Sequence, residues 1–111
     1  MRSVIEYKGY YSKVLYSAED GVLHGKIEGI SDLVNFECES VNEVESSFHE
    51  AVDDYLAFCA DLGKEPEKPY RGVFNVRFSP ELHRRAAMEA ANEGITLNQL
   101  VTRAVEKMLP Q

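Results

Sequence analysis

Two polar side chains in the C-terminal part of the chain are of the kind that reads DNA bases. Asn75 and Arg77 alternate with apolar residues in the stretch "VFNVRF", residues 73–78, which is the period-2 pattern of a half-buried β-strand. Arg pairs with guanine and Asn with adenine through two hydrogen bonds in the major groove, which admits a two-stranded ribbon. The pattern therefore predicts a strand that presents Asn75 and Arg77 on its outer face. Solvation of an exposed strand face is the alternative role of these two residues.

The predicted strand needs a partner, because a lone strand leaves backbone donors and acceptors unpaired along both edges. Ser79 and Pro80 suit the start of a helix that is predicted to end at Gly94, and Thr96 and Gln99 form the capping-box pattern of a second helix. A strand and two helices of fewer than about 40 residues cannot bury a core alone. The same strand of a second copy is therefore the expected partner, in a twofold dimer. The predicted dimer core consists of Phe74, Val76, Phe78, Leu82, Leu100 and Val101.

Charge divides the chain into two parts with different expected partners. The whole sequence carries a formal net charge of −7, but residues 1–70 hold six Lys and Arg against fifteen Asp and Glu, and residues 71–111 hold six against four. The acidic first part repels phosphate and could attract a basic protein, whereas the second part could approach DNA. Acidity that only maintains solubility is the alternative.

The first part is predicted to be a small antiparallel sheet covered by one helix. Strands are expected over residues 10–16, 22–27 and 33–38, and the short turns between them favour a meander. Ser40 and Glu43 form a capping-box pattern before a helix whose apolar stripe suits a sheet face. The stripe consists of Val44, Phe48, Val52, Tyr55, Cys59 and Leu62.

A stretch rich in proline and charge, "KEPEKPYRG", separates the two parts and is typical of a stiff linker. Gly63, just before it, suits the left-handed residue that follows a helix. The predicted fold class is α+β. A β-β-β-α domain over residues 1–65 is followed by a linker over 66–72 and a β-α-α dimerisation domain over 73–111.

The C-terminal segment, with "FNVRF", "SPEL" and "EGITLNQLV", resembles the ribbon-helix-helix family of DNA-binding dimers over residues 71 to about 109. The resemblance implies that outward strand residues read bases and that the amides opening the second helix hold a backbone phosphate, as helix N-termini do in general. The implied base readers are Val73, Asn75 and Arg77, and the implied phosphate contacts are Arg71, Thr96, Leu97 and Asn98. Val73 departs from the usual polar residue and could touch a thymine methyl or contribute nothing.

The stretch from "SAEDGVLHGKIEG" to "KEPEKPYRG" is similar to the HicB antitoxins, whose N-terminal domain is a truncated RNase H-like fold and whose tail is often a ribbon-helix-helix. With both halves in the expected order, the resemblance covers nearly the whole chain. It implies a type II toxin–antitoxin role. The expected partners are a HicA-type toxin, which is a small basic RNA-cleaving protein, operator DNA of the shared operon, and a second copy of the chain, with higher oligomers left open.

Two other functions remain open from the sequence. A stand-alone ribbon-helix-helix repressor would use its N-terminal domain for oligomerisation or for sensing a small molecule. A metal-dependent nuclease would need several converging carboxylates, at least one of them within the first strand, where this sequence has Lys13 and no acid. Asp20, Glu28 and Asp32 are expected in turns. We therefore expect a protein that is not an enzyme, with no metal site and no cofactor.

Composition agrees with a globular protein, since 44% of residues are hydrophobic and 28% charged. Cys38 and Cys59 are too few for a disulfide framework and lack metal-ligand spacing. No apolar run approaches the ~20 residues that cross a bilayer, and no secretory signal is evident, so we expect a cytoplasmic protein without a membrane partner. Whether the clustered tyrosines Tyr7, Tyr10, Tyr11 and Tyr16 belong to the core or to an interface stays open.

Overall fold

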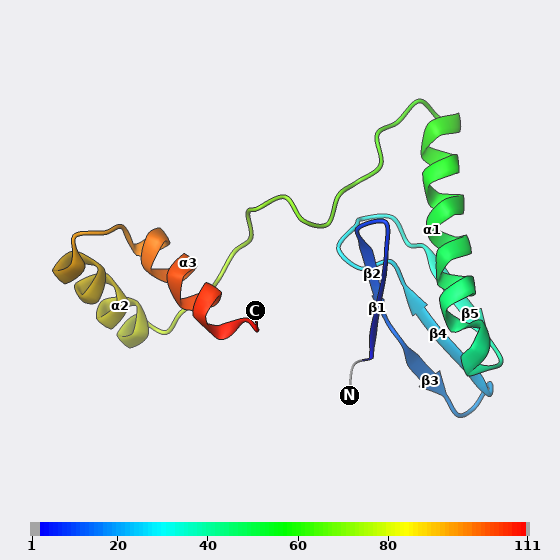
Figure 1. Cartoon of the computed structure of the whole chain (residues 1–111), viewed down its shortest axis with the longest axis horizontal. Helices are drawn as coiled ribbons and strands as arrows, with labels where there is room; N and C mark the ends of the chain where they lie inside the picture. Colours follow the sequence, from blue (N-terminus) through cyan, green and yellow to red (C-terminus); the bar gives the residue numbers. More distant parts are fainter. Residues whose placement is uncertain (1–2, 111) are drawn as a thin grey trace. The chain divides into compact units, whose positions relative to one another are not determined.

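The computed structural model describes residues 3–110, and the chain divides into two compact units, Met1–Val73 and Phe74–Gln111 (Figure 1). The described part is α+β, with two small antiparallel sheets and three α-helices. All of the strands belong to the N-terminal unit, which also contains the first helix. The other two helices make up the C-terminal unit.

Five short strands form the sheets of the N-terminal unit. β1 (Val4–Tyr7) pairs with β2 (Tyr10–Lys13), and β3 (Leu15–Ser17), β4 (Val22–Lys26) and β5 (Asn35–Cys38) form an antiparallel meander with β4 at its centre. The strand expected over residues 10–16 is thus divided in two. The strand β1 was not predicted from the sequence. It is linked to β2 by a two-residue turn, Lys8 and Gly9, with positive φ angles of 52° and 82°. Such turns suit the twist of a hairpin.

Gly25 permits β2 to pass close to β4. A Cβ atom at this position would overlap the carbonyl oxygen of Lys13 and Oγ of Ser12. Ser12 is fully buried, and its hydroxyl donates to the Lys13 carbonyl (2.7 Å) and accepts from the Lys26 amide (3.1 Å). A glycine is therefore required where the two sheets adjoin.

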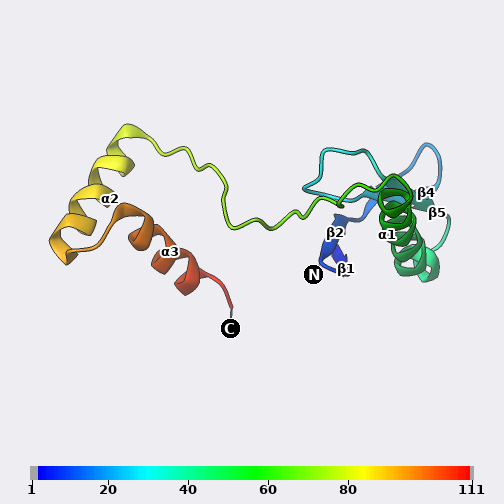
Figure 2. The ribbon, with the colours of Figure 1, turned by 90° about the horizontal axis from the view of Figure 1, so that it is seen from above.

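Helix α1 (Val44–Asp61) lies against β4 and β5 and covers one face of the sheet (Figures 1 and 2). Its buried side chains are five of the six in the predicted stripe, which confirms the direction of the amphipathic face. Leu62 is the exception, because it follows the last helical residue and is 60% exposed. The buried core of the unit consists of Tyr10, Ile27, Phe36, Cys38, Val44, Phe48, Val52, Tyr55 and Cys59.

The start of α1 differs from the prediction. A single 3₁₀ turn, Val41–Glu43, precedes the α-helix, and the Ser40 side chain makes no capping hydrogen bond to the backbone. Its hydroxyl instead donates to the Glu43 carboxylate (2.9 Å). The predicted capping box is therefore wrong, because the two side chains satisfy each other. Gly63 follows the helix with a φ of 66°, as predicted.

The C-terminal unit consists of α2 (Pro80–Glu93) and α3 (Leu97–Met108), and the predicted start and end of α2 and the predicted start of α3 are confirmed. Ser79 Oγ accepts from the Leu82 amide (3.1 Å), and Gly94 ends α2 with a φ of 72°. Thr96 and Gln99 form the expected capping box, with both reciprocal hydrogen bonds present. The local signals in this segment were therefore sufficient to define both helices.

Candidate functional site

Residues 73–78 have no regular secondary structure in the single chain, which differs from the predicted strand (Figure 2). A strand requires a neighbouring strand to pair its amides and carbonyls, and the residues on either side of this segment offer none. A strand here would depend on a second copy of the chain. The prediction that this segment forms a ribbon therefore stays a prediction.

The three residues proposed to read bases lie on this extended segment and are open to solvent. Val73 is 85% exposed, and Asn75 and Arg77 are also exposed. Neither Asn75 nor Arg77 makes a side-chain hydrogen bond or ion pair with another described residue. The polar groups of these two side chains are thus available to a ligand.

The six residues of the predicted dimer core are not buried within one chain. Phe74, Val76 and Leu82 are 74%, 54% and 46% exposed, and the other three are half-buried. In the described part of the C-terminal unit only Ala90 is buried. Two short helices with one buried alanine and several exposed apolar side chains do not constitute a stable core.

The residues proposed to hold phosphate lie at the start of α3 and before the extended segment. Thr96 caps α3: its hydroxyl accepts from the Gln99 amide (3.0 Å), while its own amide donates to the Gln99 side chain (2.8 Å). Leu97 and Asn98 open the helix, where backbone amides lack partners within the helix. Arg71 is exposed. The structure brings Thr96, Leu97 and Asn98 together on one helix end and leaves Arg71 on a different part of the chain.

The acidic charge of the N-terminal unit is concentrated in part on the outer face of α1. Glu50, Asp54 and Asp61 are spaced four and seven residues apart, and all three are exposed. At 100° per residue this spacing places them within about 40° of one another, opposite the buried stripe. Within residues 3–110, no cation forms an ion pair with any of them, whereas Asp53 on the flank of the helix pairs with Lys8 (2.9 Å). The outer face of α1 is thus a row of uncompensated carboxylates.

The acids considered for metal chemistry do not converge. Asp32 pairs with Lys64 (3.0 Å). Across the described residues, no group of three His, Cys, Asp or Glu side chains could hold a metal ion. Cys38 and Cys59 are buried and free.

The clustered tyrosines have different roles. Tyr10 belongs to the core, and burial raises the pKa of its hydroxyl above the ordinary value. Tyr7 stacks on His49 at 3.9 Å between ring centroids, and Tyr11 stacks on Tyr70 at 5.9 Å. Tyr16 is 67% exposed and remains a candidate for an interface.

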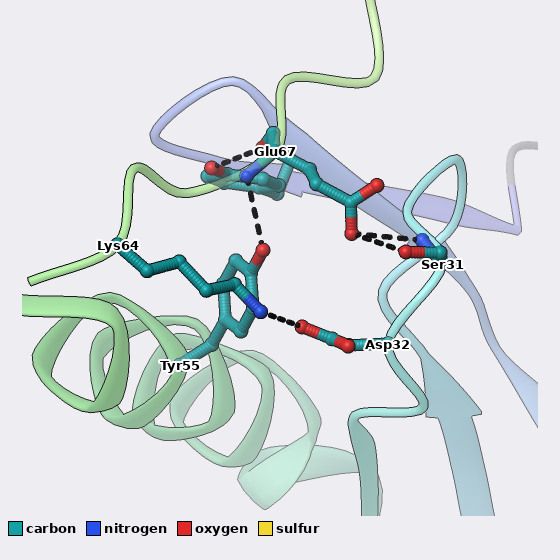
Figure 3. A network of polar contacts seen from close by, with 6 residues as sticks. Ser31, Asp32, Tyr55, Lys64 and Glu67 are labelled. Carbon is teal, nitrogen blue, oxygen red and sulfur yellow. Dashed lines mark hydrogen bonds and ion pairs between the residues drawn. The ribbon is translucent and has the colours of Figure 1, made fainter. Parts of the chain in front are cut away.

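Part of the segment predicted as a linker is held by the N-terminal unit. Glu67 bonds to Ser31 and to two core tyrosines, Tyr10 and Tyr55 (Figure 3). The hydrogen bonds of Glu67 could not be predicted, because proline and charge are equally typical of a free linker. The aromatic residue Tyr70 was the one local indication that this segment packs against the rest of the unit.

A protein-family model described as the HicB family matches residues 55–105. The match begins within α1, includes the connection between the units and ends within α3, so it covers parts of both units. The match covers 51 of the 111 residues and supports membership of the HicB family. HicB proteins are antitoxins of toxin–antitoxin systems and are generally not enzymes. No curated protein and no solved structure matches this chain significantly. Within residues 3–110, no helix is both long and apolar enough to cross a membrane.

Proposed function

We propose that the chain is an antitoxin that binds and neutralises a HicA-type ribonuclease toxin and represses its own operon. It would bind operator DNA as a ribbon-helix-helix dimer, while its N-terminal unit, a partial RNase H-like domain, holds the toxin. The family match carries the proposal, because it spans part of each unit and so links both to one antitoxin family. The protein would act in the cytoplasm, where RNA and operator DNA are both present.

The outer face of α1 supports the toxin-binding half of the proposal. A protein that grips RNA displays basic groups, and a complementary acidic surface would attract and cover them. Glu50, Asp54 and Asp61 are exposed and lack ion-pair partners within the described chain, so they can pair with a partner's cations without breaking an existing bond. We place the toxin contact on this face.

The exposed apolar side chains of the C-terminal unit support the DNA-binding half. Phe74, Val76 and Leu82 are largely open in one chain, and pairing of two copies would bury them between two sets of helices. The same pairing would turn Asn75 and Arg77 outward to the major groove. The cap of α3 at Thr96 would then supply amides for a backbone phosphate.

The experiment is calorimetric titration of a purified HicA-type toxin with the full-length protein. The variant Glu50→Lys/Asp54→Lys should bind the toxin at least about tenfold more weakly, because like charges would face the partner. The matched control, Glu89→Lys/Glu106→Lys, changes the net charge equally on exposed positions of α2 and α3 and should retain affinity.

The stand-alone repressor is the alternative function and makes a different forecast. It would bind operator DNA normally and show no heat with any HicA-type toxin. Equal weakening by both double variants would indicate that net charge, and not the α1 face, determines the interaction.

A further inference from the structure

Residues 64–70 are attached to the N-terminal unit by the main chain of Glu67. Its amide donates to the Tyr55 hydroxyl (3.0 Å), and its carbonyl accepts from the Tyr10 hydroxyl (2.7 Å) (Figure 3). Tyr10 and Tyr55 are 5% and 4% exposed, and their rings meet edge to face at 6.0 Å. The segment thus supplies hydrogen-bond partners to two buried hydroxyls, which are costly to leave unpaired.

The side chain of Glu67 makes a second attachment, to the loop between β4 and β5. One carboxylate oxygen accepts from both the amide (3.0 Å) and the hydroxyl (2.7 Å) of Ser31. These hydrogen bonds lower the pKa of the Glu67 carboxyl. Lys64 pairs with Asp32 of the same loop at 3.0 Å. Ser31 and Asp32, which are consecutive in the loop, therefore bind Glu67 and Lys64 of the segment.

The loop between β4 and β5 also approaches the segment closely at Gly29. Gly29 has a φ of 78°, and a Cβ atom there would lie 2.6 Å from Cβ of Pro69. The loop can thus approach the proline only because it has no side chain at this point. Next to it, the ring of Tyr70 stacks on Tyr11 with an angle of 19° between the planes.

From these contacts we infer that residues 64–70 form a strap, held closed through Glu67, that sets the length of the connection between the two units. With the strap closed, the free chain runs only from Tyr70 to Phe74, which spans at most about 14 Å when extended. With the strap released, the free chain begins at Gly63 and spans at most about 40 Å. Release of the strap would therefore let the two units separate much further, whatever each of them binds.

Limited trypsin digestion of the full-length protein tests the strap with two sites in one chain. Trypsin cleaves after Lys and Arg but not before proline, so Lys64–Glu65 reports on the strap, Arg71–Gly72 reports on the free connection, and Lys68–Pro69 is silent. The measured quantity is the rate of cleavage after Lys64 divided by the rate of cleavage after Arg71. In the wild type this ratio should be at least about tenfold lower than in a synthetic peptide of residues 58–76, because the rate of proteolysis follows the population of the open state.

Two variants should remove this protection by different routes. Glu67→Ala removes the attachment to Ser31, and Tyr55→Phe removes the partner of the Glu67 amide while keeping the ring packed in the core. Each should shift the ratio of the two cleavage rates toward that of the peptide, with the circular dichroism of the helices unchanged. Glu19→Ala, a change at an exposed turn position, should leave the ratio at the wild-type value.

Two results would overturn the inference. A wild-type ratio equal to that of the peptide would mean that the strap is open in solution. Wild-type protection retained in both variants would mean that Glu67 does not hold it. Because the assay contains neither toxin nor DNA, its outcome is independent of the proposed function.

Discussion

Arg77 and Thr96 are expected to contribute to DNA binding in different ways. If Arg77 reads a guanine edge, Arg77→Ala should cost about 1–3 kcal/mol on the operator and relax the preference at one base position per half-site. Thr96→Ala removes the N-cap of α3, at about 1 kcal/mol of helix stability, and would loosen the proposed phosphate contact, which carries no sequence information. It should weaken binding to all sequences alike.

Titration of both variants against operator and scrambled duplexes at one fixed salt concentration measures the difference, because phosphate contacts make affinity depend steeply on salt. Equal losses on the two duplexes for Arg77→Ala would make that residue an anchor and not a base reader. No loss on either duplex would mean that the extended segment does not enter the groove.

Gly25→Ala should destabilise the N-terminal unit by about 3 kcal/mol, because the added Cβ would meet a backbone oxygen and a buried hydroxyl. Urea unfolding followed by tyrosine fluorescence measures this unit alone, since all six tyrosines lie within residues 7–70 and the chain has no tryptophan. Gly21→Ala is the comparison: its φ is 67° but a Cβ has open space there, so about 1–2 kcal/mol is expected. A smaller loss for Gly25→Ala than for Gly21→Ala would contradict the close approach of β2.

The Glu67 carboxylate should stabilise the N-terminal unit only while it is ionised. Its pKa is lowered from the ordinary value of 4.5, chiefly by the hydrogen bond from the Ser31 hydroxyl. A lowered folded-state pKa means that the contribution is fully present above the unfolded-state value and is lost as the pH falls through the folded-state value. The difference in unfolding free energy between wild type and Glu67→Gln should therefore be constant near neutral pH and shrink below about pH 4.5. A difference that persists undiminished in acid would show that the charge of Glu67 does not matter.

At the scale of elements, sequence signals succeeded where they were local. The caps at Ser79 and Thr96 and the left-handed glycines at 63 and 94 depend on residues within one helical turn, and the structure has all of them. The Ser40–Glu43 pattern failed because the two side chains can bond to each other as readily as to the backbone. The strap could not be predicted, because its partners Tyr10 and Ser31 are 57 and 36 residues away from Glu67 in sequence.

The segment 73–78 should become a strand only in a dimer. Phe74→Asp would place a charge in the interior of the ribbon, where an unpaired charge is very costly, and should convert the protein to a monomer with reduced helix content in residues 80–108. Sedimentation and circular dichroism across a range of protein concentrations measure both effects. Asn75→Asp, which adds the same charge on the outer face, is the control and should remain dimeric.

A wild-type protein that sediments as a folded monomer at micromolar concentration, with α2 and α3 intact, would contradict the ribbon. In a dimer the thermal midpoint should also rise with protein concentration, because the core of the C-terminal unit would exist only between chains.

At the scale of the whole molecule, charge and pattern divided the sequence into two parts with opposite electrostatic character, and the structure has two compact units. A single chain does not provide a buried core for the C-terminal unit, because the apolar side chains of this unit are exposed. The proposed place of the toxin contact could not be predicted from the charge count alone, because that count does not show which of the carboxylates share the outer face of α1. The proposed neutralisation of a toxin would require that the carboxylates on the outer face of α1 be accessible in the full-length protein.

The most direct measurement is RNA cleavage by a purified HicA-type toxin during titration with the full-length protein. Cleavage should fall to the background at a sharp end point near one N-terminal unit per toxin. Arg77→Ala should give the same end point as the wild type, and Glu50→Lys/Asp54→Lys should require a large excess of protein. RNA cleavage that continues undiminished in the presence of excess wild-type protein would contradict the antitoxin function.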